Sequence, residues 1–383
     1  MKLSPINLML MLTVFSGIAV RTAPRVVLPL FALALGAEPL TVGLLAATFS
    51  VLIAILAVPS GKLADYLGSR WVLTLGSVGG VISLLVPYVM PNMVGLFIAA
   101  AITGLSVGVT EIALQNLTGI LSTKDDRSRN FSNYSVMVTV GNFAGPLISG
   151  LSIDYFGHAA TCLYLALLAL TPLVILALWG GALPGGTRRF ERTKEGGNWT
   201  TLSEPGVRKV LATNALLNTG KDLYNFYLPV YMHAIGLSAS IIGTVLAVNG
   251  AASFAVRIVL PRLIERFREE KLLAYSFYVG SASLMLIPLF QDAVILALIS
   301  FIFGLSLGCS SPVITILMFM NAPKERSGET LGLRTTVTHI VRIVGPITFG
   351  AIGSAVGLPP IFWIDALMLG AGGMISYPKK VVQ

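Results

Sequence analysis

Runs of about 20 mostly apolar residues follow one another along the whole chain, separated by short breaks that contain charged residues, Gly or Pro. Folded as a helix, each run is long enough to cross the roughly 30 Å hydrocarbon core of a bilayer. Only 11% of the 383 residues are charged, whereas soluble domains carry about a quarter. The composition therefore excludes a soluble enzyme, a fibrous protein and a disordered chain, and it predicts a polytopic membrane protein.

We count twelve such runs and expect all of them to be helices, because lipid offers no hydrogen-bond partner to an open strand edge. The predicted spans of the first half are residues 6–35, 40–59, 71–89, 93–121, 131–153 and 159–183. Those of the second half are residues 207–235, 239–260, 272–290, 293–320, 330–355 and 360–376. The one long polar segment predicts three regions: a six-helix bundle over 1–183, a cytoplasmic linker over 184–206 and a second six-helix bundle over 207–383.

The basic residues indicate the orientation of these spans. Twenty of the 26 Lys and Arg residues lie at the termini, in the linker and in every second connection. The other connections contain none; they surround Ala37, Asn92, Gly157, Gly236, Asp292 and Gly357. This asymmetry predicts a multi-pass protein of the cell (inner) membrane with both termini in the cytoplasm. It also accounts for the net charge of +9 without a nucleic-acid partner.

The N-terminus has one alternative interpretation. Lys2 followed by an apolar stretch to Val20 is similar to a secretory signal. Because the apolar pattern resumes beyond Arg21 and Arg25 and continues to Leu35, we expect an uncleaved first span.

An internal repeat relates the two halves at an offset of 200 residues. Among the aligned anchors are Pro29 with Pro229, Gly36 with Gly236, and Gly145-Pro146 with Gly345-Pro346. An even number of spans separates the copies, so both halves have the same orientation. Parallel repeats with a site between them are an arrangement of secondary transporters. The predicted fold class is an all-α polytopic membrane protein with twelve transmembrane helices in two parallel six-helix repeats.

The loop after the second predicted span reads Gly61-Lys62-Leu63-Ala64-Asp65-Tyr66-Leu67-Gly68-Ser69-Arg70. It resembles the Gly-x-Leu-Ala-Asp-Arg-x-Gly-Arg-Arg signature of the major facilitator superfamily, with Tyr66 and Ser69 at two of its basic positions. The resemblance covers the whole chain and implies that family's transporter fold. It also implies a gating motif of Gly61, Asp65, Gly68 and Arg70, in which Asp65 latches onto a neighbouring helix end or onto Arg70. The alternative is that Asp65 only anchors the turn.

The fifth span carries Gly141-x-x-x-Gly145-Pro146-x-x-x-Gly150, which is similar to the Gly-Pro motif of the family's antiporters. The resemblance implies a gating role for Gly145 and Pro146. Close packing through small residues and a helix kink are the alternatives. Where proton-linked exporters of the family often have an arginine in the fourth span, this chain has Ala100. The resemblance therefore does not imply proton antiport by that route.

Six bases lie inside the predicted spans, where a charge costs roughly 2.5–3.5 kcal/mol and should face a cavity or a partner. They are Arg21, Arg25, Lys221, Arg257, Arg334 and Arg342. Arg21 and Lys221 are equivalent under the repeat, so we expect them to converge between the halves. Arg257 and Arg334 lie nearer the predicted cytoplasmic ends, where snorkelling to the interface is the favoured interpretation.

Polar residues recur at helical spacing around these bases, as a cavity wall requires. The expected substrate-binding residues are Arg21, Arg25, Lys221, Tyr224, Asn225 and Arg342. The family's organophosphate exchangers place a pair of arginines similarly in the first and seventh spans, so the resemblance implies an anionic substrate. For Tyr224, packing within an aromatic cluster is the alternative.

Glu111 and Asp222 are the expected carriers of a coupling proton. A nearby base favours the charged form of a carboxyl group, and an anion that competes for the base would trigger protonation. A permanent ion pair is the alternative for both. His339 is a candidate pH sensor, with an interhelical hydrogen bond as its alternative. Asp365, alone in the twelfth span, fits no assigned role.

Other chemistries find little support. Residues 104–108 and 304–308 match the hydrolase pattern Gly-x-Ser-x-Gly, but inside spanning helices the same glycines are better explained by helix packing. No nucleotide-binding or zinc spacing is present, and Cys162 and Cys309 lie singly in apolar runs. We therefore expect no enzyme activity, no cofactor and no metal.

The predicted function is secondary active transport of a small organic anion or weakly acidic amphiphile by alternating access. The expected partners are that substrate, the lipid bilayer and protons, and we expect a monomer. A multidrug efflux antiporter for neutral or lipophilic compounds is the alternative, favoured by the Gly-Pro motif and by the scarcity of acids that would bind cations. A transporter-like receptor or scaffold is disfavoured, because buried charges would cost stability without a transport role.

Overall fold

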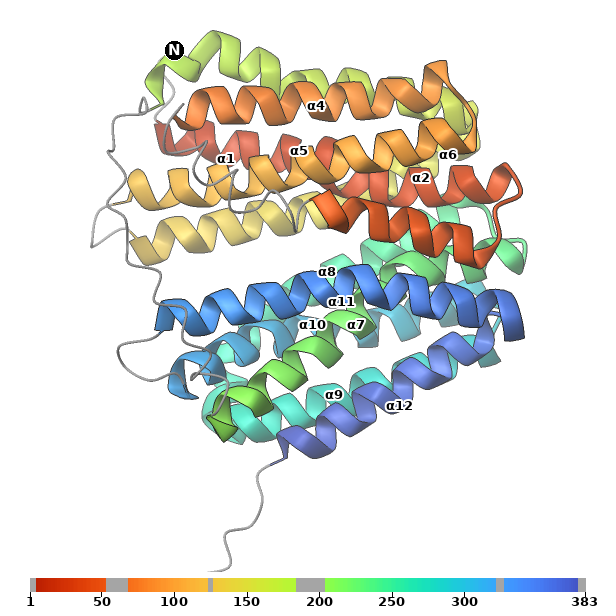
Figure 1. Ribbon diagram of the computed structural model, residues 1–383. Coiled ribbons are helices and arrows are strands. Elements are labelled where there is room, and N and C mark those ends of the chain that lie inside the picture. The colour runs from red at the N-terminus through yellow and green to blue at the C-terminus, as the bar shows by residue number, and fades with distance from the viewer. Residues whose placement is uncertain (1–4, 53–67, 123–126, 184–203, 322–326, 378–383) are drawn as a thin grey trace, which may run out of the picture.

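The computed structural model describes residues 5–52, 68–122, 127–183, 204–321 and 327–377, and the regular structure in these ranges is helical (Figure 1). The first half contains α1 (Pro5–Ser16), a π-helical turn (Gly17–Thr22), α2 (Ala23–Ala34), a helix over Pro39–Leu52, α4 (Ser69–Val89), α5 (Met93–Ile120) and α6 (Arg127–Trp179). The second half contains α7 (Pro205–Ala234), α8 (Ala239–Phe267), α9 (Glu269–Leu286), α10 (Ala293–Asn321), α11 (Ser327–Val356) and α12 (Pro359–Ser376). Helix occupies part of every predicted span, which confirms the all-α polytopic fold.

Nine helical stretches of the described chain are long and apolar enough to cross a membrane. One of them, α6, holds two predicted spans, because Gly157 (φ 77°, ψ 170°) breaks the helix between them. The helix over Pro39–Leu52 is shorter, since its predicted span runs on beyond the described residues. α7 is long enough but too polar, and its polar side chains line the cavity described below.

The helices of the first half, red to yellow-green in Figure 1, lie beside those of the second half, green to blue. We call the end at which α1 and α7 begin the linker end, and the opposite end the short-turn end. Four glycines in left-handed backbone conformations turn the chain there: Gly36 and Gly236 (both φ 84°), Gly157 (77°) and Gly357 (89°). Only glycine adopts such angles at little cost. The turns recur at the predicted offset of 200 residues.

Glycine also lets the two halves touch near the short-turn end. A Cβ atom on Gly43 would collide with the carbonyl oxygen of Pro346, and one on Gly243 with the carbonyl oxygen of Pro146. The repeat relates these two contacts, and each joins one half to the other. Gly145 packs inside its own half, where a Cβ would collide with Thr22. Close backbone packing through small residues therefore describes both members of the Gly-Pro motif.

A carboxylate of the first half caps a helix of the second half at the short-turn end. Asp154 accepts hydrogen bonds from the backbone N–H groups of Ala239 (3.0 Å) and Ser240 (2.8 Å). These residues begin α8, where N–H groups lack partners within the helix and negative charge is favourable. At the equivalent position of the repeat, Ser354 Oγ accepts from the N–H of Leu40 (3.0 Å). The halves thus exchange caps, one charged and one neutral.

We predict that Asp154→Ala loosens the short-turn end more than Ser354→Ala, because it removes two hydrogen bonds to a charged acceptor instead of one to a hydroxyl. Loss of a cap costs about 0.5–2 kcal/mol, and we expect Asp154 near the upper limit. Spin labels on Tyr155→Cys and His233→Cys, exposed positions in different halves, report the separation by double electron–electron resonance. The distance distribution should lengthen and broaden in Asp154→Ala.

Cys162 and Cys309 are both buried, so labelling is directed to the introduced cysteines. Distributions that stay unchanged in both alanine variants would mean that the caps do not hold the halves together.

Candidate functional site

A cavity with about 1170 Å³ of empty space, including its open mouth, lies between the halves. The first half contributes the π-helical turn, α2 and α6, and the second half contributes α7, α8, α10 and α11. Its bases are Arg25, Lys221, Arg257 and Arg334, and its amides are Asn142, Asn214, Asn218, Asn225 and Asn249. None of the described residues that line it is acidic or aromatic. The wall is therefore positively charged and rich in neutral hydrogen-bonding groups.

The cavity extends from the middle of the helices toward the linker end. On α6, which begins at the linker end, the lining residues lie within 139–146; on α8, which begins at the short-turn end, they lie within 246–257. The contact between Pro146 and Gly243 stands on the short-turn side of this region. The backbone contact and the helix caps close that side, so the cavity faces the linker end.

Three of the six expected substrate-binding residues line this cavity. Lys221 is exposed to it, and Arg25 and Asn225 are half-buried in its wall. Tyr224 is fully buried and packs its ring on Phe303, with centroids 4.6 Å apart. This arrangement agrees with aromatic packing, the alternative to substrate binding for this residue.

The other two expected bases, Arg21 and Arg342, are engaged outside the cavity wall. Arg21 Nη2 donates to the Val138 carbonyl (3.3 Å) and to Asn142 Oδ1 (3.2 Å). Arg342 Nε lies 3.3 Å from Asp222 Oδ2, and the two side chains are 25% and 7% exposed. The repeat matches Asn142 with Arg342. In the first half this position accepts a hydrogen bond from Arg21, whereas in the second half it forms an ion pair with Asp222.

Arg257 and Arg334 line the cavity. From their sequence positions near the linker end, we expected snorkelling to the interface instead. Arg257 Nη1 donates to Ser135 Oγ (3.2 Å) of the other half. Arg334 donates from Nε to Asn214 Oδ1 (3.0 Å) and from Nη1 to Thr315 Oγ1 (2.8 Å). The four-residue steps from Arg334 to Thr338 and Arg342 already indicated a polar face. The same spacing from Asn249 to Ser253 and Arg257 indicated a polar face on α8.

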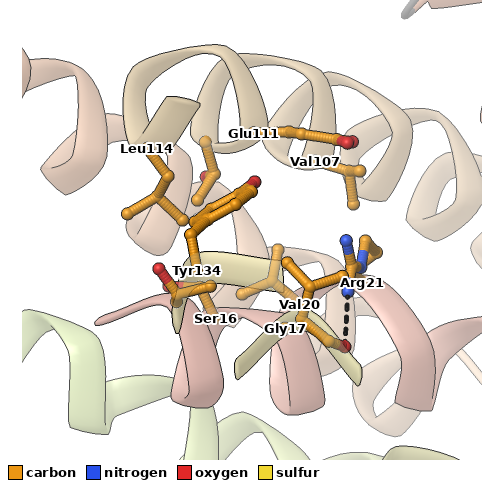
Figure 2. A pocket seen from close by; sticks show the side chains of 11 residues that line it. Ser16, Gly17, Val20, Arg21, Val107, Glu111, Leu114 and Tyr134 are labelled. Atoms are coloured by element: carbon orange, nitrogen blue, oxygen red, sulfur yellow. Dashed lines mark hydrogen bonds between the residues drawn. The ribbon is translucent and has the colours of Figure 1, made fainter. Parts of the chain in front are cut away.

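A smaller pocket lies within the first half, between the first span, α5 and α6 (Figure 2). Glu111, Tyr134 and Arg21 line it, and the Glu111 and Arg21 side chains end in the same part of the pocket. Glu111 accepts from Gln115 Nε2 at 3.4 Å and forms no ion pair with any described base. Arg21 belongs to the π-helical turn Gly17–Thr22, a feature that often marks functional positions.

The described part of the loop motif contacts its own half. Gly61 and Asp65 lie outside the described residues. Gly68 has φ 81° and ψ 155° before α4, and its repeat partner Arg268 adopts a similar conformation (φ 60°, ψ 157°) without being glycine. Arg70 is exposed and lies against Gly180, where a Cβ atom would be 2.9 Å from its Nε.

His339 and Asp365 line neither pocket. His339 is half-buried, and its Nδ1 has no hydrogen-bond partner in the described part of the chain. Asp365 is 1% exposed, and both its carboxyl oxygens lack partners among the described residues.

Comparisons with known proteins agree with this architecture. The family model of the Major Facilitator Superfamily matches residues 10–346. An uncharacterized MFS-type transporter of Methanocaldococcus jannaschii is 22% identical over 361 residues, 92% of each chain. The quinolone resistance protein NorA of Staphylococcus aureus (strain COL) is 25% identical over 363 residues, which cover 92% of this chain and 91% of NorA.

Solved transporter structures share the fold at low sequence identity. A crystal structure of a mutant of the nucleoside transporter NupG aligns with a TM-score of 0.78 and 13% identity, covering 97% of this chain and 100% of that one. A POT family transporter in complex with 5-aminolevulinic acid aligns with a TM-score of 0.78 and 14% identity, covering 97% and 94%. From its helical architecture and the family match over most of its length, the chain belongs to the Major Facilitator Superfamily and is a membrane transporter, not an enzyme.

Proposed function

We propose that the chain moves a small organic anion or a weakly acidic amphiphile across the membrane by alternating access. The observation that carries this proposal is the cavity wall, with four bases and no acid among the described residues that line it. Four bases at membrane depth cost on the order of 10 kcal/mol. A bound anion offsets part of that cost and gains charge-assisted hydrogen bonds.

A multidrug efflux antiporter for neutral or lipophilic compounds is the second candidate, supported by the similarity to NorA. Sites for lipophilic ligands are lined mainly by hydrophobic and aromatic side chains. The described wall of this cavity has five amides and no aromatic residue, and its apolar members are few: Val26, Pro146, Leu217, Leu246 and Leu307. The lining therefore favours the anion.

We place the protein in the cell (inner) membrane with both termini in the cytoplasm. Exposed bases at the linker end, such as Arg208, Arg262 and Arg266, support this orientation. In it, the cavity faces the cytoplasm and the contact between Asp154 and α8 lies on the outer side.

Glu111 is the proposed carrier of a coupling proton. Arg21 is hydrogen-bonded to Asn142, which lines the large cavity, while Glu111 stands near Arg21 in the small pocket. An anion that draws Arg21 toward the large cavity removes the base that shares the small pocket with Glu111, and the neutral form of Glu111 is then favoured. When the anion departs, Arg21 is free to approach Glu111 and the proton is released. Proton and anion would thus be bound together. The pH-sensor role of His339 stays a prediction.

We predict that Arg25→Gln and Lys221→Gln each raise the half-saturating concentration of a transported organic anion by about 10- to 100-fold. The reason is the loss of a charge-assisted hydrogen bond, worth about 1.5–3 kcal/mol. Counterflow in proteoliposomes with a panel of carboxylates and phosphate monoesters measures it. Arg262→Gln and Lys271→Gln, which change exposed bases at the linker end, are the matched controls. The proposal would be contradicted if no anion were transported and if efflux of a neutral lipophilic dye were the same in both cavity variants as in the unmodified protein.

For Glu111→Gln, we expect loss of accumulation driven by a pH gradient while anion counterflow persists, because exchange needs no net proton movement. Glu265→Gln, which changes an exposed carboxylate on α8, should retain both activities. Gradient-driven accumulation that survives in Glu111→Gln would remove Glu111 from the coupling mechanism.

Asp222 is instead expected to act as a permanent partner of Arg342. Removing one member of a buried pair leaves an uncompensated charge and costs about 3–5 kcal/mol, with the lower limit appropriate because Arg342 is 25% exposed. Asp222→Asn should lower the thermal midpoint of the purified protein by several degrees, and adding Arg342→Gln should restore part of it. A stable Asp222→Asn protein that exchanges anions but no longer responds to a pH gradient would assign the coupling proton to Asp222.

A further inference from the structure

The bases of the large cavity lie at two depths, and the spacing of their contact residues along α7 gives the difference. Arg334 donates to Asn214 Oδ1 (3.0 Å). Asn214 precedes Lys221 by seven residues on the same helix, a rise of about 10 Å along its axis. Because α7 begins at the linker end, the contact of Arg334 lies that much nearer the mouth of the cavity than the backbone of Lys221.

α6 gives an independent measure for the other half. Arg257 donates to Ser135 Oγ (3.2 Å), and Ser135 precedes Asn142 by seven residues, again about 10 Å. Asn142 accepts from Arg21, which the repeat matches with Lys221. Arg257 is therefore about 10 Å nearer the linker end than Arg21. Arg25 follows Arg21 by four residues in a span that begins at the linker end, so it lies deeper still. We call Arg25 and Lys221 the inner pair, and Arg257 and Arg334 the outer pair.

Between the two pairs the wall is uncharged, and apart from Leu217 on α7 it is largely polar. Asn218, Asn249 and Ser253 line this stretch. Each donates one hydrogen bond to a backbone carbonyl, of Asn214, Ser300 and Gly304 respectively. The second proton of each amide and the acceptor oxygens remain for a ligand. Such a wall complements hydroxyl groups on the middle of a ligand better than an alkyl chain.

The charges of the outer pair are not neutralised by the described protein. The hydrogen bonds of Arg257 and Arg334 go to neutral hydroxyl and amide groups, and Arg257 Nε is buried without a partner in the described part of the chain. A guanidinium carries five N–H donors, of which Arg334 uses Nε and Nη1. Donors and positive charge therefore remain for a ligand.

Resting on the proposed function, we propose that the substrate is an elongated, hydroxylated dianion whose acidic groups reach two pairs of bases that lie about 10 Å apart along the helix axes. The inner pair binds one acidic group, the outer pair binds the other, and the amides between them bind the hydroxyl groups. Arg25 of the first half and Lys221 of the second line the same cavity. In the outer pair, Arg257 of the second half donates to Ser135 of the first. A single dianion thus contacts bases of both halves at the inner pair and bases of the second half at the outer pair.

Three hydroxy acids test this arrangement on the purified full-length chain by isothermal titration calorimetry. Glucarate carries a carboxylate at each end of a six-carbon polyol, gluconate lacks the second carboxylate, and tartrate is a shorter diacid. We expect glucarate to bind at least about 10-fold more tightly than either, because the second charge-assisted contact is worth that factor or more.

Variants then assign the second carboxylate to the outer pair. Arg257→Gln and Arg334→Gln should reduce glucarate affinity to that of gluconate and leave gluconate affinity unchanged, whereas Lys221→Gln should weaken both. Arg262→Gln, five residues beyond Arg257 on α8, is the control and should change neither. Arg334 is hydrogen-bonded to Asn214 and Thr315, so Arg334→Gln could fail to fold. In that case Arg334→Lys, which keeps the charge, is the replacement variant. The Arg334→Lys protein should bind glucarate at an intermediate affinity.

Equal affinities for glucarate and gluconate in the unmodified protein would overturn the inference, as would outer-pair variants that weaken both acids alike. Two gluconate molecules per chain would also overturn it, by showing two separate monoanion sites. Binding of none of the three acids overturns it too, and the proposed function then rests on the wider counterflow panel.

Discussion

A guanidinium or ammonium group among apolar helices is stable only where water, a counter-charge or hydrogen-bond acceptors reach it. This chain meets the requirement differently at each base. Arg342 has the carboxylate of Asp222, Arg334 has amide and hydroxyl oxygens, and Lys221 is exposed to the cavity. The cavity and the polar character of α7 follow from this requirement, because helices that carry such groups cannot close on one another as apolar surfaces do.

The internal repeat is the second constraint on the architecture. It places equivalent glycine–proline contacts on both sides of the interface between the halves and equivalent caps at the short-turn end. The copies have diverged where charge is concerned: Asp154 corresponds to Ser354, and Asn142 to Arg342. The backbone contacts are therefore symmetric between the halves, whereas the charges at the polar contacts differ.

Much of the fold was predictable from the sequence, and part of the site was not. Hydropathy and the repeat predict the twelve spans, because membrane-spanning helices need long apolar runs regardless of their neighbours. They also place Arg25, Lys221 and Asn225 near the middle of the bundle. The rotation of each helix is set by packing, so the sequence did not separate Arg21, held by Asn142, from Arg25 on the cavity wall. The depth of the cavity is likewise a property of the packed helices. The sequence position of Arg257 and Arg334 therefore indicated snorkelling and not a place on the cavity wall.

The uncompensated charge of the cavity has an electrical consequence. Four bases line the wall and no acid does among the described residues, so the empty carrier holds net positive charge within the membrane field. Moving one elementary charge through that field changes the free energy by about 2.3 kcal/mol per 100 mV. When the cavity is empty, the membrane potential therefore influences the rate at which the carrier changes between its two orientations. A bound anion cancels part of the charge, so the voltage sensitivity of the loaded form differs from that of the empty form.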